Sequence, residues 1–343
     1  MGRTPTSFSM PDLENGKVPN KYFGAYDNLF RAFYSEKLDL DDTNIATVLS
    51  GAMALIDVAE SVGSAEIIRE SVDIALLRQG QVLYRSIGAN ALAWVDLGRR
   101  LQSPTIFKEA LIHLVGQWNA IDIRERGQLE TSVREICERK HAELDITKQG
   151  MEMRMLGHYP GFLRRNIAET GHVGRTTYAN DIYMWMTVAL FRQWFAQNIC
   201  ENRNLTAADG GAYMYRQISA GGSAYLDHTK LATFHQYFPM SPKAKNVLEN
   251  HMNSLKAELQ IFPGELLKNR SQIDDSHDPL PYLTCAIIEK SDFPWTPKIP
   301  VIPATAPKPT TGSKRRYEDM DEDSDEDFGY LGSSSAVQTN GHS

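Results

Sequence analysis

The chain has 343 residues, of which 42% are hydrophobic and 23% charged, so it can supply a core for two modest domains. Its formal net charge of -7 argues against direct nucleic-acid binding, because neutralising phosphates needs a surplus of Lys and Arg on one face. The three cysteines, Cys137, Cys200 and Cys285, are too far apart for a CxxC metal clip and odd in number for a disulfide set, which indicates a reducing, intracellular compartment. No apolar run approaches about 18 residues and no apolar signal region follows Met1, so we expect neither a membrane span nor ordinary secretion.

The chain is predicted to become ordered near Lys21. Residues 1–20 are polar and contain prolines and glycines, so we expect a flexible N-terminus. Large apolar side chains then recur at helical spacing, at Tyr22, Tyr26, Leu29, Phe30 and Phe33. Asp41 and Asp42 are candidate N-caps for the helix that follows.

Four short helices are predicted next. Apolar residues three and four apart place one buried stripe on the first of them, which ends at Gly63. This stripe comprises Ile45, Val48, Leu49, Ala52, Leu55, Ile56, Ala59 and Val62. A second helix is expected from Ser64 to Gly80, and two shorter ones within 82–87 and 92–101.

The best-specified helix begins at Ser103 and Pro104, an N-cap and first-turn pair. Its stripe comprises Ile106, Phe107, Ala110, Leu111, Leu114, Val115 and Trp118. Residues 124–155 have a high charge density and a narrow apolar seam, so we predict a long, partly exposed helix that bridges two subdomains.

An aromatic-rich helix is predicted over 178–200. Its Met and aromatic stripe is interpreted as core packing, because such side chains bury the largest areas. The stripe comprises Ile182, Trp185, Met186, Leu190, Trp194 and Phe195. Two further helices are expected at 207–220 and 242–259, separated by Gly221-Gly222 and a loop around Pro239.

The C-terminal tail changes in composition to prolines, a basic triplet and an acidic run, which cannot bury enough apolar surface to become ordered. Lys314, Arg315 and Arg316 form a minimal nuclear-import cluster. Ser324 precedes three acidic residues and is a candidate phosphorylation site for an acidophilic kinase. The alternative is a solubilising acidic tail. The expected location is the nucleus, the cytoplasm or both.

No recognised catalytic motif is found: the sequence has no GxGxxG, GxxxxGK[ST], HExxH, GxSxG or CxxC pattern. We therefore predict no catalytic residues, no cofactor and no metal site. His113 lies four residues after Glu109 on a predicted helix, where a hydrogen-bonded structural histidine is the preferred interpretation over half of a catalytic pair. The remote alternative, an enzyme with an unrecognised helical site, expects a pocket that gathers His113, Glu109 or His228.

Several segments, taken in order, resemble the second half of a fungal BTB/POZ domain followed by a helical extension. They are YDNLF at 26–30, FY at 33–34, residues 38–44 and 52–63, ALLRQGQ at 75–81, AWVD at 93–96, EALIHLVG at 109–116 and GGSAYL at 221–226. The resemblance spans about residues 21–295. The opening half of such a domain has no counterpart before Tyr26, so a truncated domain is implied and homodimerisation stays open.

The resemblance implies a mainly α fold, with a short strand after the FYS sequence at 33–35. The implied domains are a flexible N-terminus (1–20), a BTB/POZ-like remnant (21–80), a helical extension (81–298) and a disordered acidic tail (299–343). Because BTB domains dimerise, join cullin-type ubiquitin ligases or recruit transcriptional partners, the implied partners are other proteins of these kinds.

The resulting hypothesis is a non-catalytic adaptor that links partners to a cullin-type ubiquitin ligase, with a nuclear, transcription-associated regulator as the alternative. The candidate partner-binding residues are Tyr26, Phe30, Phe33, Leu38 and Leu40. Without the opening strands, we expect Tyr26, Phe30 and Phe33 to lack their usual cover, leaving an apolar patch on the order of several hundred Å².

Overall fold

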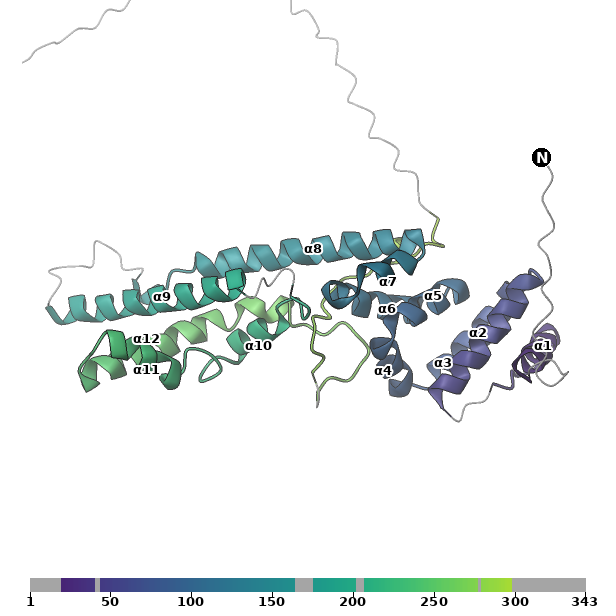
Figure 1. The fold of residues 1–343 in the computed structure, drawn as a ribbon, viewed down its shortest axis with the longest axis horizontal. Helices are drawn as coiled ribbons and strands as arrows, with labels where there is room; N and C mark the ends of the chain where they lie inside the picture. Colours follow the sequence, from purple (N-terminus) through teal and green to yellow (C-terminus); the bar gives the residue numbers. More distant parts are fainter. Residues whose placement is uncertain (1–19, 41–43, 164–174, 202–206, 277–278, 298–343) are drawn as a thin grey trace, which may run out of the picture. The chain divides into compact units, whose positions relative to one another are not determined.

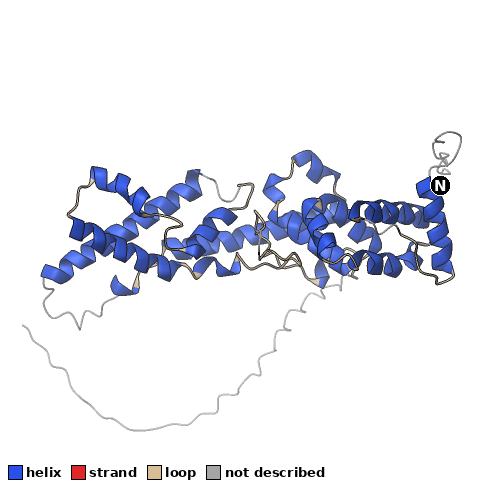
Figure 2. Cartoon of the chain, turned by 90° about the horizontal axis from the view of Figure 1, so that it is seen from below, coloured by secondary structure: helices blue, strands red, loops and turns tan. Residues whose placement is uncertain are grey.

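The structure is a computed structural model that describes residues 20–40, 44–163, 175–201, 207–276 and 279–297. Helices joined by turns and loops make up this part of the chain, and no residue in it belongs to a strand (Figure 2). The prediction of a mainly α protein is confirmed. The predictions for residues 1–19, for Asp41 and Asp42, and for the tail from 299 onward concern residues outside the described part of the chain.

The N-terminal part of the chain forms a series of short helices, as the apolar periodicity predicts (Figure 1). They are α1 (Asn20–Phe33), α2 (Ile45–Ser61), α3 (Ala65–Leu77), α4 (Gln81–Ala89), α5 (Ala91–Leu101), α6 (Pro104–Gly116), η1 (Trp118–Ala120) and α7 (Ile123–Gln128). The remaining elements are α8 (Thr131–Leu156), η2 (Gly161–Leu163), α9 (Arg175–Glu201), α10 (Ala212–Ala220), α11 (His228–Tyr237), α12 (Pro242–Leu259), η4 (Phe262–Glu265) and η5 (Lys290–Asp292).

Local side-chain caps fix where several helices begin. The side chain of Ser103 accepts a hydrogen bond from the backbone nitrogen of Ile106 at 3.2 Å, with Pro104 in the first turn of α6, so this predicted start is confirmed. Helix α2 is instead capped by Asn44, whose side-chain oxygen accepts from the nitrogen of Thr47 at 2.9 Å. The expectation of an aspartate cap is therefore replaced by Asn44, the residue directly before the helix.

Three predicted helix boundaries or elements are wrong. The expected helix over 124–155 is divided into α7 and α8, because Leu129 is extended and Glu130 starts a new helix by accepting from the nitrogens of Ser132 and Val133. Helix α10 begins at Ala212, because the preceding glycine pair has positive φ. Helix α11 was not predicted at all.

The buried row of α9 differs from the predicted stripe. Met184, Val188, Phe191 and Phe195 are buried, whereas Ile182 and Trp185 are exposed. The helix has large apolar residues around most of its circumference, so composition alone does not select the face that packs against α12.

The closest helix packing is between α5 and α6. A Cβ built on Gly98 would lie 2.8 Å from the backbone nitrogen of Phe107, so only glycine permits this approach. Almost every residue of α6 from Ile106 onward is buried, because α4, α5 and α8 all contact it. Helix α6 therefore forms the centre of the core.

Helix α8 carries charged residues into that core. Lys140 is buried and its Nζ lies 3.2 Å from an oxygen of Asp292, while the Nζ of buried Lys148 lies 2.6 Å from an oxygen of Asp145. Farther along, buried Glu152 accepts a hydrogen bond from the hydroxyl of Tyr215 in α10 at 2.6 Å. Helix α8 thus has contacts with α6 and with the C-terminal helices.

Two glycine substitutions should change stability in opposite directions. A Cβ on Gly116 would overlap the carbonyl oxygen of Leu283, so Gly116→Ala should lower the free energy of unfolding by about 1–3 kcal/mol. Gly150 lies exposed within α8 with nothing within 4 Å of its added Cβ, so Gly150→Ala should raise it by up to about 1 kcal/mol. Urea unfolding followed by circular dichroism measures both; equal effects of the two variants would contradict this packing.

Candidate functional site

One side of helix α1 is built into the core. Ala25, Leu29 and Ala32 are buried where α1 packs against α2 and α3. Asn28 is also buried, and its side-chain amide accepts from the nitrogen of Asp39 at 2.6 Å and donates to the Asp39 carbonyl at 3.0 Å. These bonds hold the segment after α1 against the helix, so the orientation of α1 is fixed from both sides.

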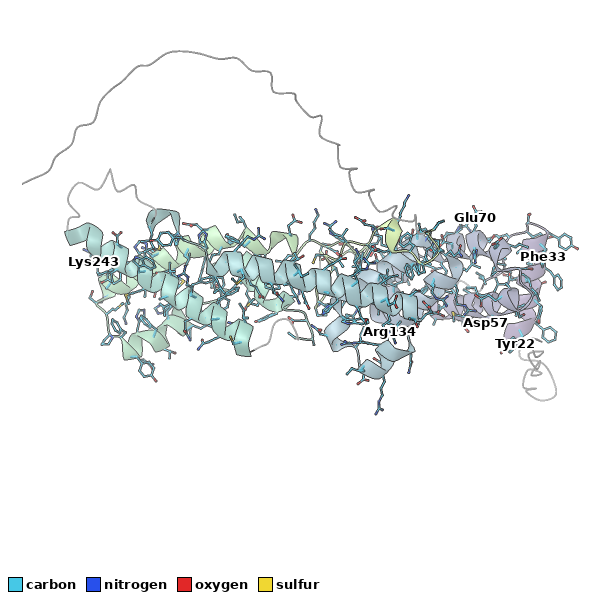
Figure 3. All side chains as sticks on the ribbon, turned by 90° about the horizontal axis from the view of Figure 1, so that it is seen from above. Tyr22, Phe33, Asp57, Glu70, Arg134 and Lys243 are labelled. Carbon is cyan, nitrogen blue, oxygen red and sulfur yellow. The ribbon has the colours of Figure 1, made fainter. Side chains whose placement is uncertain are left out.

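The other side of α1 carries a row of exposed aromatic side chains, here called the α1 aromatic stripe: Phe23, Tyr26, Phe30 and Phe33. Their spacing of three, four and three residues places them along one face, and each is between 43% and 61% exposed. In Figure 3 the side chain of Phe33 extends outward from α1. Tyr34 follows directly and is 78% exposed.

A charged pair borders the stripe. The Nε of Arg31 donates to a carboxylate oxygen of Asp27 at 2.8 Å, and both residues lie on α1 beside the aromatic row. Helix α1 therefore has three strips: a buried one, an apolar exposed one and a charged one. An apolar strip with a polar border is the usual form of a protein interaction surface.

The predicted partner-binding residues divide between this surface and the core. Tyr26, Phe30 and Phe33 lie together on the stripe, whereas Leu38 is buried and Leu40 half-buried against the core. The two leucines pack inward because Asn28 fixes the segment that carries them. Phe23 was not among the candidate residues predicted from the sequence, although its spacing of three residues from Tyr26 places it on the same helix face.

Helices α9 to α12 surround a second cluster of aromatic side chains. Phe191 stacks on Phe195 with ring centroids 5.5 Å apart, and Trp194 stacks on Tyr225 at 4.6 Å. Helices α9 and α12 pack along one another, as Figure 1 shows. The aromatic residues of α9 are thus joined to the α10–α11 loop.

A buried lysine holds that loop in place. The Nζ of Lys256 donates to the carbonyl oxygens of Gly222 at 2.6 Å and Leu226 at 3.2 Å, and lies 4.9 Å from the ring centroid of Tyr225. Burial lowers the pKa of this amine. The glycine pair at 221 ends α10 with positive φ, which confirms its interpretation as helix punctuation.

A groove of about 330 Å³ lies between this loop, α11 and α12. His228 and Glu249 line it and are paired, with the Nδ1 of His228 2.7 Å from the carboxylate oxygen. The two side chains are hydrogen-bonded to each other, so the groove offers polar contacts beside its apolar lining.

His113 and Glu109 belong to a buried polar cluster with residues far along the chain. The Nε2 of His113 lies 3.1 Å from Glu109 and its Nδ1 lies 2.9 Å from the hydroxyl of Tyr282. The hydroxyl of Ser271 donates to Glu109 at 2.5 Å, and the nitrogen of Gln272 donates to both oxygens of that carboxylate.

This cluster differs from a hydrolytic triad. In a triad, one ring nitrogen of the histidine accepts the serine proton and the other donates to a carboxylate. Here the Nε2 of His113 faces both Ser271 and Glu109, and its Nδ1 contacts the hydroxyl of Tyr282. His113 is fully buried. The arrangement satisfies buried polar groups and ties α6 to the segment around 271, which fits the structural interpretation of His113.

The residues of the enzyme hypothesis are not gathered in one pocket. Glu109 borders a pocket beside α6, whereas His228 lines the groove beside α12. In the described part of the chain, no three His, Cys, Asp or Glu residues form a group able to hold a metal ion. None of the helices described is long and apolar enough to cross a membrane.

Comparison with known proteins identifies a family for part of the chain. Residues 160–262 match the fungal family model of the FF domain, which is a protein-interaction domain. The match covers helices α9 to α12 and less than half of the chain. No curated protein and no solved structure matches.

The BTB/POZ resemblance is contradicted by this comparison, because the matching family is the FF domain. The segment 36–40, expected to contain a strand, contains none. The resemblance rested on the order of several amphipathic stretches, and such stretches are shared by many helical proteins. The cullin link loses its support with it, whereas protein partners remain supported by the FF match.

The tail residues Lys314, Arg315, Arg316 and Ser324 lie outside the described residues. Nuclear import and phosphorylation at these positions therefore stay predictions.

Thiol labelling tests whether a reactive cysteine is present. Burial raises the pKa of the Cys137 thiol to about 12 and that of Cys285 to about 11, whereas Cys200 is exposed. A thiol-specific chromogenic reagent should therefore label one cysteine in the native chain and three after unfolding in urea. Cys200→Ser should abolish native labelling; rapid reaction of Cys137 or Cys285 would contradict the packing around them.

Proposed function

We propose that this chain is a non-catalytic protein-interaction adaptor that binds a partner through the α1 aromatic stripe. The observation that carries the proposal is the exposure of four aromatic side chains in one row on a helix whose opposite side is fixed in the core. Exposed apolar rows of this kind cost solubility, so they mark surfaces that are covered by a partner.

The geometry of the stripe favours a helix as the partner. An apolar row spaced by three and four residues matches the ridge of another amphipathic helix, which can lay its own apolar side chains between the rings. Asp27 and Arg31 at the border can pair with charges of either sign at the edge of that helix. We therefore propose that the partner contributes an amphipathic helix.

The size of the surface indicates a transient complex. An aromatic side chain has roughly 150–250 Å² to bury, so four side chains that are about half exposed leave on the order of 400 Å² on this chain. Counting both partners, the contact buries about 800 Å², below the range of about 1,200–2,000 Å² typical of stable complexes. Reversible binding suits an adaptor that exchanges partners.

The FF-like helices supply a second interaction module in this proposal. Their match to an interaction family, together with the groove beside Lys256, supports a further protein contact there. The buried bonding of His113 and Glu109 supports the absence of catalysis.

The stripe is tested by changing two of its aromatic residues in the full chain. Phe23→Ser with Phe30→Ser should weaken binding of the helical partner by roughly thirtyfold, because truncating central aromatic anchors costs about 2 kcal/mol or more. The partner is first captured by a photo-crosslinking amino acid placed at position 30, and its purified helix is then titrated against both chains by calorimetry.

The matched control is Ile67→Ser with Ile74→Ser, which removes two exposed apolar residues from α3 in the same bundle. The control should leave affinity within about twofold of the natural chain. Sedimentation tests a competing occupant, since dimerisation of the natural chain that is lost in the Phe23 and Phe30 variant would assign the stripe to a second copy and refute the partner helix.

A further inference from the structure

A pocket of about 390 Å³ lies beside the start of α6 and is lined by basic residues from three separate segments. Lys108 comes from α6, Arg270 from the loop after η4 and Lys290 from η5. The pocket lies outside the FF-like residues and away from the α1 aromatic stripe, and neither surface uses these three cations.

Arg270 has no partner for its charge. Within the described residues no carboxylate pairs with it, and its Nε is buried without a hydrogen-bond partner. Other part-buried or buried cations in this chain are ion-paired: Arg100 lies 2.6 Å from Asp57, and Lys140 lies 3.2 Å from Asp292. Arg270 is half-buried, and a buried guanidinium nitrogen without a partner is costly, so an incoming anion gains free energy there.

Lys108 and Lys290 add to the same positive field. Both side chains are exposed, and neither forms an ion pair in the described part of the chain. The one acidic residue of the lining, Glu109, has its two oxygens occupied by Ser271, Gln272 and His113. Three free cations therefore face one carboxylate that is already satisfied.

The remaining lining selects the kind of anion. Ile288 and Phe293 are buried apolar residues that border the pocket, so it offers apolar contact next to the charges. A carboxylate side chain can engage the planar fork of Arg270 in two parallel hydrogen bonds, and neighbouring carboxylates can reach the lysines. An inorganic anion would gain the attraction to the three cations but no apolar contact with Ile288 and Phe293.

We propose that this pocket is a binding site for a carboxylate-rich peptide segment, with Arg270 as its central anchor. The occupant we propose is a segment of another protein, because its carboxylates complement the three cations of the lining. The experiment distinguishes it from the chain's own residues 318–327, which contain eight acidic side chains in ten positions.

The experiment uses a fluorescent peptide with the sequence of residues 317–328 and a full-length chain in which the eight acidic residues of 318–327 are changed to Asn and Gln, so that no internal segment competes. Anisotropy should show saturable binding that weakens as salt rises. Arg270→Gln should weaken it by roughly tenfold or more, and Arg270→Lys by less, because lysine keeps the charge and loses the fork.

Lys268→Gln is the matched control, since it removes an exposed positive charge two residues away that does not line the pocket. Equal losses in Arg270→Gln and Lys268→Gln would overturn the proposal, as would full displacement of the peptide by inorganic phosphate at the same concentration. Equal binding to the natural and the neutralised chain supports a segment of another protein as the occupant. Weaker binding to the natural chain would overturn that assignment, because the chain's own acidic run would then be competing for the pocket.

Discussion

Buried charge on α8 is the constraint on which much of this structure depends. Lys140, Lys148 and Glu152 lie along one helix in places with little water, and a buried charge is tolerated only when it is paired and hydrogen-bonded. Their partners come from α8 itself, from η5 and from α10. The pairings of Lys140 and Glu152 each tie a separate part of the chain to α8, whereas that of Lys148 lies within the helix. The helix therefore organises its surroundings through polar contacts as well as through its narrow apolar seam.

The same logic explains the irregular segment that follows η4. It forms no long helix, yet it provides the partners for Glu109 and His113 through Ser271 and Tyr282. Aromatic packing completes its attachment, because Phe293 stacks on Trp295 at 5.2 Å and both rings meet Phe107 edge-on. This largely irregular segment is thus held in place by hydrogen bonds and aromatic contacts to α6. It brings Arg270 and Lys290 to the pocket beside the start of α6.

Sequence periodicity was sufficient to place most helices, because the apolar spacing of α2, α6 and α12 and the Ser103-Pro104 start are local properties. Periodicity failed where contacts between distant segments determine which side chains are buried or paired. The face of α9 that is buried depends on α12, and two partners of Glu109, Ser271 and Gln272, lie more than 160 residues away, where no spacing rule reaches. The family assignment failed for a related reason, since ordered amphipathic stretches describe helices in general and carry little of the information that distinguishes one helical family from another. The exposed aromatic row of α1 was predictable, because its apolar residues are too many for one buried face.

The long-range bonds of the cluster around His113 bear on how the chain is made. Helix α6 leaves the ribosome well before residues 271 and 282. Arg139 of α8 is likewise synthesised 153 residues before its partner Asp292. During synthesis the central helices therefore lack the groups that satisfy their buried polar atoms, and apolar surface on α6 lacks Phe293 and Trp295. We therefore expect the central helices to expose apolar surface and unsatisfied polar groups until residues 271–295 have been synthesised.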